Sequence, residues 1–332
     1  MDTEQEEMQF LGILDIFKES YKIIFTWRKI FTQITLSLIL PLTFIFLAHI
    51  QISDLIFADI MHDERQLDRT VINSPRYNKL NDLISSDWTY LMLFKFAYFT
   101  FFLIFSLLST AAVVYTIACI YTGRDVSFKK VMSVVPKVWK RLMVTFLCIF
   151  SAVFAYHVVA IILFIMLAVL ISDDATGVVS FFIFLGLYFV GIVYLSIIWQ
   201  LASVVSVLEE ACGVKAMVKS RALIKGKMWL TGIIFFTLNL CYFIIQFIFE
   251  IYVVHGRSLM INRVVYGIIC FWLLFVFFLS GLVIQTVIYF VCKSYHHENI
   301  DKSALSDHLE VYLLGEYVPL KAKDVQLEQF EV

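Results

Sequence analysis

Charged residues are scarce in this sequence. Asp, Glu, Lys and Arg make up 16% of its 332 residues, whereas soluble globular domains contain about 25%. Hydrophobic residues make up 61%, above the roughly 45–50% that is typical of such domains. This composition excludes an ordinary soluble domain and predicts a polytopic membrane protein.

Motifs of well-known enzyme classes are also missing. The chain has no Gly-rich phosphate loop, no Gly-x-Ser-x-Gly motif and no His-Glu-x-x-His motif. Its six cysteines lack the CxxC spacing of a zinc site. No polar segment is long enough for a conventional catalytic domain, and no basic domain suited to nucleic acid is present. We therefore expect no enzymatic activity, no cofactor, no metal and no nucleic-acid partner.

Long apolar runs dominate what is present. About 20 apolar residues cross roughly 30 Å of hydrocarbon, and six stretches meet that length: 31–50, 90–120, 144–171, 178–205, 228–254 and 264–291. Runs of this length are helices, because backbone groups in hydrocarbon must be satisfied internally. The predicted fold is an all-α polytopic membrane bundle with six transmembrane helices. Pro41 is expected to kink the first.

The polar segment 51–88 is the one sizeable outer loop that the spans leave. We expect short helices in this loop, with Ser85, Ser86 and Asp87 capping the second span.

Lys and Arg are concentrated in alternate polar segments. They are frequent before residue 31, between the second and third spans, between the fourth and fifth, and after the sixth. The positive-inside rule then places both termini in the cytosol. We expect the endoplasmic reticulum or another endomembrane rather than the plasma membrane.

A pattern recurs three times along the chain. Trp27-Arg28-Lys29 and Trp139-Lys140-Arg141 each stand just before a span, and Lys225-Gly226-Lys227-Met228-Trp229 is a looser third copy. Each copy is preceded by an amphipathic segment with helical spacing. The predicted unit is an interfacial amphipathic helix plus a helical hairpin. Units 8–122, 123–206 and 207–293 form one membrane domain, 1–293, followed by a cytosolic polar tail, 294–332.

The three amphipathic segments have different apolar faces. The first consists of Phe10, Ile13, Leu14, Phe17, Tyr21, Ile24 and Phe25. The second consists of Phe128, Val131, Met132, Val135, Trp139 and Leu142, with Pro136 expected to kink or break its helix. The third is smaller, with Ala216, Met217, Ser220, Leu223 and Ile224. Here we expect Glu209 and Glu210 to end the fourth span, and Gly213 and Gly226 to bound the interfacial helix.

Basic residues beside these segments are candidates for lipid contact. Each Lys or Arg near an anionic membrane surface contributes about 1 kcal/mol. The candidate headgroup contacts are Arg28, Lys29, Lys137, Lys140, Arg141, Lys225 and Lys227. An equally weighted alternative is that these segments only set topology and pack against the protein.

Polar residues inside the spans are few and costly. Asn239, Tyr242, Gln246 and Glu250 form one stripe on the fifth span, and a salt bridge from Glu250 to Lys95 is predicted. The candidate intramembrane polar network is Lys95, His157, Gln200, Asn239, Gln246, Glu250 and Gln285. These residues could line a pathway through the membrane. The favoured interpretation is that they make interhelical hydrogen bonds.

The segment Val207-Leu-Glu-Glu, with Gly213, Ala216, Ser220, Leu223, Lys225-Gly226 and Trp229, resembles a signature of multi-pass membrane proteins. That group includes the membrane domain fused to some bacterial glycerophosphoryl diester phosphodiesterases. With Trp27-Arg28-Lys29-Ile30-Phe31 and Leu314-Gly-Glu-Tyr-Val-Pro319, the whole chain more closely resembles a plant family of uncharacterised six-span proteins. The resemblance implies an α-helical membrane protein. The phosphodiesterase domain itself is missing, so the resemblance implies no catalysis.

Three functions remain open at this point. The leading one is a non-enzymatic protein that organises membrane lipids or partner membrane proteins through its cytosolic basic helices. The second is a transporter or lipid scramblase that uses the polar stripe of the fifth span. The third is an intramembrane enzyme.

Overall fold

The computed structural model describes residues 8–71, 74–170, 175–256 and 259–296. In these residues the chain is helical between short turns and contains no strand. Its six helices that are long and apolar enough to cross a membrane are Arg28–Asp68, Pro75–Tyr121, Phe128–Ala168, Gly177–Leu208, Met228–Val254 and Met260–Tyr295. The predicted all-α polytopic fold is therefore confirmed. The predicted tail lies outside the described residues from position 297 onward.

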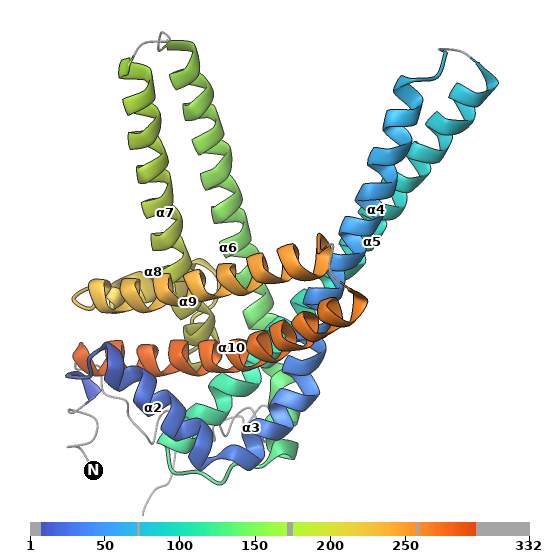
Figure 1. Cartoon of the computed structure of the whole chain (residues 1–332). Coiled ribbons are helices and arrows are strands. Elements are labelled where there is room, and N and C mark those ends of the chain that lie inside the picture. Colours follow the sequence, from blue (N-terminus) through green and yellow to red (C-terminus); the bar gives the residue numbers. More distant parts are fainter. Residues whose placement is uncertain (1–7, 72–73, 171–174, 257–258, 297–332) are drawn as a thin grey trace, which may run out of the picture.

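The six long helices pair as three hairpins (Figure 1). The first joins α4 (Leu40–Asp68) to α5 (Pro75–Tyr121), the second joins α6 (Phe128–Leu170) to α7 (Ala175–Leu208), and the third joins α9 (Met228–Phe249) to α10 (Met260–Tyr295). The three hairpins share one packed region, which we call the base. From the base they extend in different directions instead of running side by side along their whole length (Figure 1).

The main hydrophobic core lies in this base. Its fully buried side chains include Phe31 of α3 (Arg28–Ile34), Ile117 of α5, Leu142 of α6, Leu201 of α7 and Tyr289 of α10. Residues from all three predicted units thus share one core. Lipid tails are as apolar as leucine, so this core gains from close side-chain packing rather than from exclusion of water.

The far part of the α6–α7 hairpin has little contact with the rest of the protein. Only 6% of the most apolar stretch of Phe128–Ala168 is buried, against 67% for Pro75–Tyr121. Its exposed side chains are mostly Phe, Ile, Leu and Val. Such a surface is suited to lipid tails.

The predicted outer loop is instead the far end of the α4–α5 hairpin. Helix α4 continues to Asp68 and α5 begins at Pro75, so the prediction of short loop helices is wrong. At 1.5 Å per residue, the 47 residues of α5 span roughly 70 Å, more than twice the hydrocarbon thickness. A small cluster centred on Ile60, Ile84 and Leu91 holds the two far ends together.

Helix α5 begins earlier than the sequence pattern indicated. The Ser74 hydroxyl accepts a hydrogen bond of 3.1 Å from the Tyr77 backbone N–H, and Pro75 occupies the first turn, where its missing N–H costs nothing. Ser85, Ser86 and Asp87 lie inside the helix. The predicted cap at these residues is wrong because α5 begins at Pro75, ten residues before Ser85.

Pro41 and Pro136 both lie within continuous helical segments. A π-helical turn, Thr35–Ile39, stands just before α4, whose first turn contains Pro41. Proline lacks an N–H and its ring crowds the carbonyl four residues back, which here belongs to Ser37 within the π-helical turn. Pro136 lies within α6, which is uninterrupted. Of the two alternatives, a kink or a break, the break is wrong, and the second predicted segment is the start of α6 rather than a separate helix.

Separate helices occur at the other two places. Helix α2 (Ile13–Thr26) ends at Trp27, and α8 (Val214–Ile224) lies between Gly213 and Gly226. Both glycines have positive φ angles, 61° and 90°, a region that residues with a Cβ rarely adopt. Helix α7 ends at Leu208, so the predicted end of the fourth span before α8 is confirmed.

Candidate functional site

Glu209 is the central polar residue of the base. Its carboxylate accepts a hydrogen bond of 2.5 Å from the Tyr289 hydroxyl and one of 3.0 Å from the Lys293 ammonium, both on α10. Its second oxygen lies 2.5 Å from the ammonium of Lys219 on α8. One carboxylate therefore ties the end of α7 to two other helices.

The electrostatics of Glu209 follow from these contacts. Burial alone would raise the pKa of its carboxyl, but hydrogen bonds from Lys219, Tyr289 and Lys293 outweigh burial and hold that pKa below its ordinary value. Glu209 is consequently ionised at neutral pH. The sequence indicated only that Glu209 ends a span, because its pairing with residues about eighty positions away depends on the tertiary fold.

The second unit joins the same junction through α6. The Arg141 guanidinium donates a hydrogen bond to the Glu209 backbone carbonyl, one of the carbonyls that a helix C-terminus leaves unpaired. The Thr145 hydroxyl lies 2.7 Å from the Ser206 hydroxyl and accepts a 2.8 Å hydrogen bond from the Gly213 N–H. Arg141, a candidate headgroup contact, is thus engaged in a contact within the protein.

The other candidate headgroup residues are more accessible. Arg28, Lys29, Lys137, Lys140 and Lys225 are exposed. Lys227 is half-buried, with its ammonium 5.3 Å from the centre of the Tyr295 ring, a cation–π contact.

The three predicted apolar faces meet different surroundings. Val131, Val135 and Leu142 of α6 are buried in the core, as are Leu223 and Ile224 of α8. Packing against the protein therefore accounts for most of these two faces.

Helix α2 has apolar residues on two opposite sides. Its core side consists of the buried residues Ile16, Ser20 and Ile23. The outward side presents large exposed side chains, which we call the α2 stripe: Phe10 just before the helix, Leu14, Tyr21 and Phe25. Leu14 is 82% exposed and Phe25 71% exposed. At 100° per residue, the stripe lies opposite the core side, so the core cannot cover it.

The predicted Lys95–Glu250 salt bridge is not formed. Both residues are exposed, and neither side chain makes an ion pair with another described residue. Lys95 lies on α5 near His49 of α4, whereas Glu250 begins the π-turn Glu250–Val254 that follows α9. The prediction was wrong because equal depth in a membrane does not place two residues on facing sides of their helices.

Three members of the predicted polar network lie around the same cavity. Gln200 of α7, Asn239 of α9 and Gln285 of α10 line this cavity of about 370 Å³, which we call the central cavity. Further polar groups in its wall come from Ser106 and Tyr242. Ser109 also contributes a hydroxyl. The remaining lining is apolar, contributed by Leu42, Phe102, Trp199, Phe235, Leu238, Phe277, Phe278, Gly281 and Leu282.

The remaining members of that network lie elsewhere. His157 is on the α6–α7 hairpin, where its Nδ1 is 2.7 Å from the Val153 carbonyl and its ring meets the Tyr156 and Tyr188 rings. Gln246 is on α9 but is not among the residues that line the central cavity. The stripe on the fifth span therefore divides, with Asn239 and Tyr242 at the cavity and Glu250 exposed.

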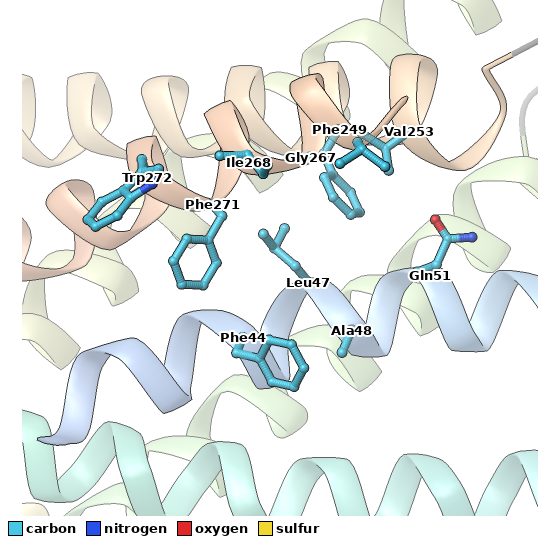
Figure 2. A pocket seen from close by; sticks show the side chains of 11 residues that line it. Phe44, Leu47, Ala48, Gln51, Phe249, Val253, Gly267, Ile268, Phe271 and Trp272 are labelled. Atoms are coloured by element: carbon cyan, nitrogen blue, oxygen red, sulfur yellow. The ribbon is translucent and has the colours of Figure 1, made fainter. Parts of the chain in front are cut away.

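A second hollow lies between α4 and α10 (Figure 2). Its volume is about 440 Å³, and Figure 2 shows Phe44, Leu47, Phe271 and Trp272 along its two sides. Gln51 is the polar residue of a lining that is otherwise apolar. This groove offers packing surface, whereas the central cavity also offers hydrogen-bonding groups.

Comparison with known protein families assigns the chain to one of them. Residues 1–330 match the family described as Domain of unknown function (DUF8558). The chain belongs to this family. No curated protein and no solved structure matches the chain. The DUF8558 chain is thus a membrane protein of six apolar helices.

Proposed function

We propose that this DUF8558 protein is a non-enzymatic membrane protein that organises lipids through its cytosolic base. The observation that carries the proposal is the α2 stripe, in which Leu14 and Phe25 stand largely exposed opposite a fully buried face. An apolar stripe with Lys18 and Lys22 on the same helix has the composition of a helix that lies in the membrane interface.

The exposed Lys and Arg residues of the same region support this proposal. Arg28 and Lys29 follow α2 directly, while Lys140 and Lys225 belong to the other two units. All these segments lie on the side that the positive-inside rule assigns to the cytosol. Anionic headgroups there would meet Lys and Arg side chains from three segments, and each of these side chains contributes about 1 kcal/mol.

A photoreactive residue on the stripe tests the proposal. We would replace Phe25 with a benzophenone amino acid in the full-length protein, reconstitute it in vesicles of phosphatidylcholine and alkyne-tagged phosphatidylserine, and measure lipid attached after illumination. Phe25 is expected to label strongly. The matched control is the same substitution at Val71, which is 78% exposed between α4 and α5 at the far end of the first hairpin. Equal labelling at both positions would contradict the proposal. Crosslinking of Phe25 to a second copy of the protein, without attached lipid, would also contradict it and would assign the stripe to self-association.

A second variant tests the electrostatic part. Changing Arg28, Lys29, Lys140 and Lys225 together to Gln should lower phosphatidylserine labelling at Phe25 several-fold, since each base contributes about 1 kcal/mol near an anionic surface. The matched control changes the exposed residues Arg65, Arg69, Arg76 and Lys79 to Gln, which alters net charge by the same amount at the far end of the first hairpin. If both variants lost the same amount of phosphatidylserine labelling at Phe25, the loss would result from the change in overall charge and would contradict a local role of these four residues.

A further inference from the structure

The central cavity lies where the three hairpins meet. Its wall contains residues of α4, α5, α7, α9 and α10, all within the membrane-spanning helices. Of its polar lining residues, Gln285 is buried, whereas Asn239 is exposed. The cavity therefore has a closed end near Gln285 and a mouth near Asn239. Trp199, 41% exposed, also lines it.

Gln285 at the closed end is short of partners. Its side chain is 3% exposed and makes no hydrogen bond with any described residue. A primary amide carries one acceptor oxygen and two N–H donors, and leaving them unpaired in a low-dielectric interior is costly. At the mouth, Asn239 uses one donor on the Phe235 carbonyl, 2.8 Å away, and its amide oxygen makes no hydrogen bond with a described residue.

The lining defines the class of ligand. It contains no Asp, Glu, Lys, Arg or His, so a charged group would enter without a counter-ion, which is strongly unfavourable in a membrane. Its polar groups are amides and hydroxyls, which both donate and accept hydrogen bonds. The rest is aromatic and aliphatic. A volume of about 370 Å³ is near the lower end of the roughly 300–1,000 Å³ of small-molecule sites.

We infer that the central cavity binds one uncharged membrane lipid. Its small head group, bearing a hydroxyl or amide, hydrogen-bonds to Gln285 at the closed end. The part of its apolar body next to the head packs along the phenylalanines toward the mouth, and the rest extends out of the cavity into the bilayer. Diacylglycerols, ceramides and sterols share this chemistry. The site is separate from the lipid surface of α2 proposed above, because none of its lining residues belongs to α2.

Gly281 offers a way to fill the cavity. It lines the cavity, and a Cβ added there would meet no atom within 4 Å. Gly281→Leu should therefore occupy ligand space without disturbing the backbone. Gly186 is the matched control, because it is exposed on α7 and an added Cβ there also meets nothing within 4 Å.

The test measures binding of three fluorescent probes, a diacylglycerol, a ceramide and a sterol, to the full-length protein in detergent micelles. Wild type is expected to bind at least one probe saturably. Gly281→Leu and Gln285→Leu should each weaken that binding roughly tenfold or more, while Gly186→Leu keeps it. The probe with the highest affinity identifies the lipid class.

Three results would overturn the inference. They are no saturable binding of any probe by wild type, unchanged affinity in Gly281→Leu, or equally tight binding of phosphatidic acid, whose head is charged. The thermal midpoint of each variant without probe is measured alongside, and Gln285→Leu should match or exceed wild type because it removes an unpaired amide. Phosphatidylserine labelling at Phe25 should survive Gly281→Leu, so failure of one lipid site is distinguishable from failure of the other.

Discussion

The base and the far part of the α6–α7 hairpin are both rich in apolar residues, yet only the base forms a buried core. At the base, Leu142 and Leu201 are almost completely buried, and Glu209 is bound by Lys219 and Lys293. In the far part of the hairpin, Phe154 is 62% exposed, and a hydrogen bond from the Tyr156 hydroxyl to the Tyr188 carbonyl joins the two helices.

This difference shows what holds membrane helices together. Apolar side chains gain little by leaving lipid for another apolar surface, so composition alone does not pack them. The base adds closely interlocked side chains and charge-assisted hydrogen bonds at the helix ends, which are the stronger polar contacts. Stability is therefore expected to reside at the base.

Glu209→Gln should destabilise the base strongly. It removes the negative charge that pairs with Lys293, whose side chain is 16% exposed, and breaking a buried ion pair costs about 3–5 kcal/mol. The loss should fall toward the lower end, since Gln retains an acceptor and Lys219 is 35% exposed. A lower thermal unfolding midpoint in micelles would report it.

Glu210→Gln is the control for that change. Glu210 is the adjacent exposed residue, and a surface substitution is usually within about 0.5 kcal/mol of neutral. A similar shift in both variants would mean that the junction at Glu209 does not stabilise the base.

A pair of truncations compares the two regions directly. Leu142→Ala removes a side chain that is 1% exposed and should cost about 2–5 kcal/mol through lost packing and the cavity left behind. Phe154→Ala, on the same helix but in the lipid-facing part, should change the unfolding midpoint little. If Phe154→Ala were the more destabilising, the far hairpin would be packed against another surface in the membrane.

Acid should weaken the base through Glu209. Because the pKa of its carboxyl is lower in the folded protein than its ordinary value of 4.5, ionised Glu209 contributes full stability above pH 4.5. That contribution is lost as the pH falls through the folded-state pKa. The midpoint difference between wild type and Glu209→Gln should be constant near neutral pH and shrink below pH 4.5. A difference that stayed constant in acid would contradict this account.

The sequence by itself predicted the six spans, because hydrocarbon imposes a minimum length and demands internal backbone hydrogen bonds. It also predicted the end of the fourth span before α8, since Gly213 and Gly226 mark turns through their backbone freedom. Both are local constraints that a single stretch of chain carries.

Only the tertiary structure decided which polar residues meet. Gln200, Asn239 and Gln285 share a cavity, whereas Lys95 and Glu250, also predicted to interact, form no ion pair. Depth along a span is readable from sequence, but the rotation of each helix is set by packing against its neighbours. The exposed α2 stripe was decided in the same way, because α2 has two apolar sides and only packing selects the buried one.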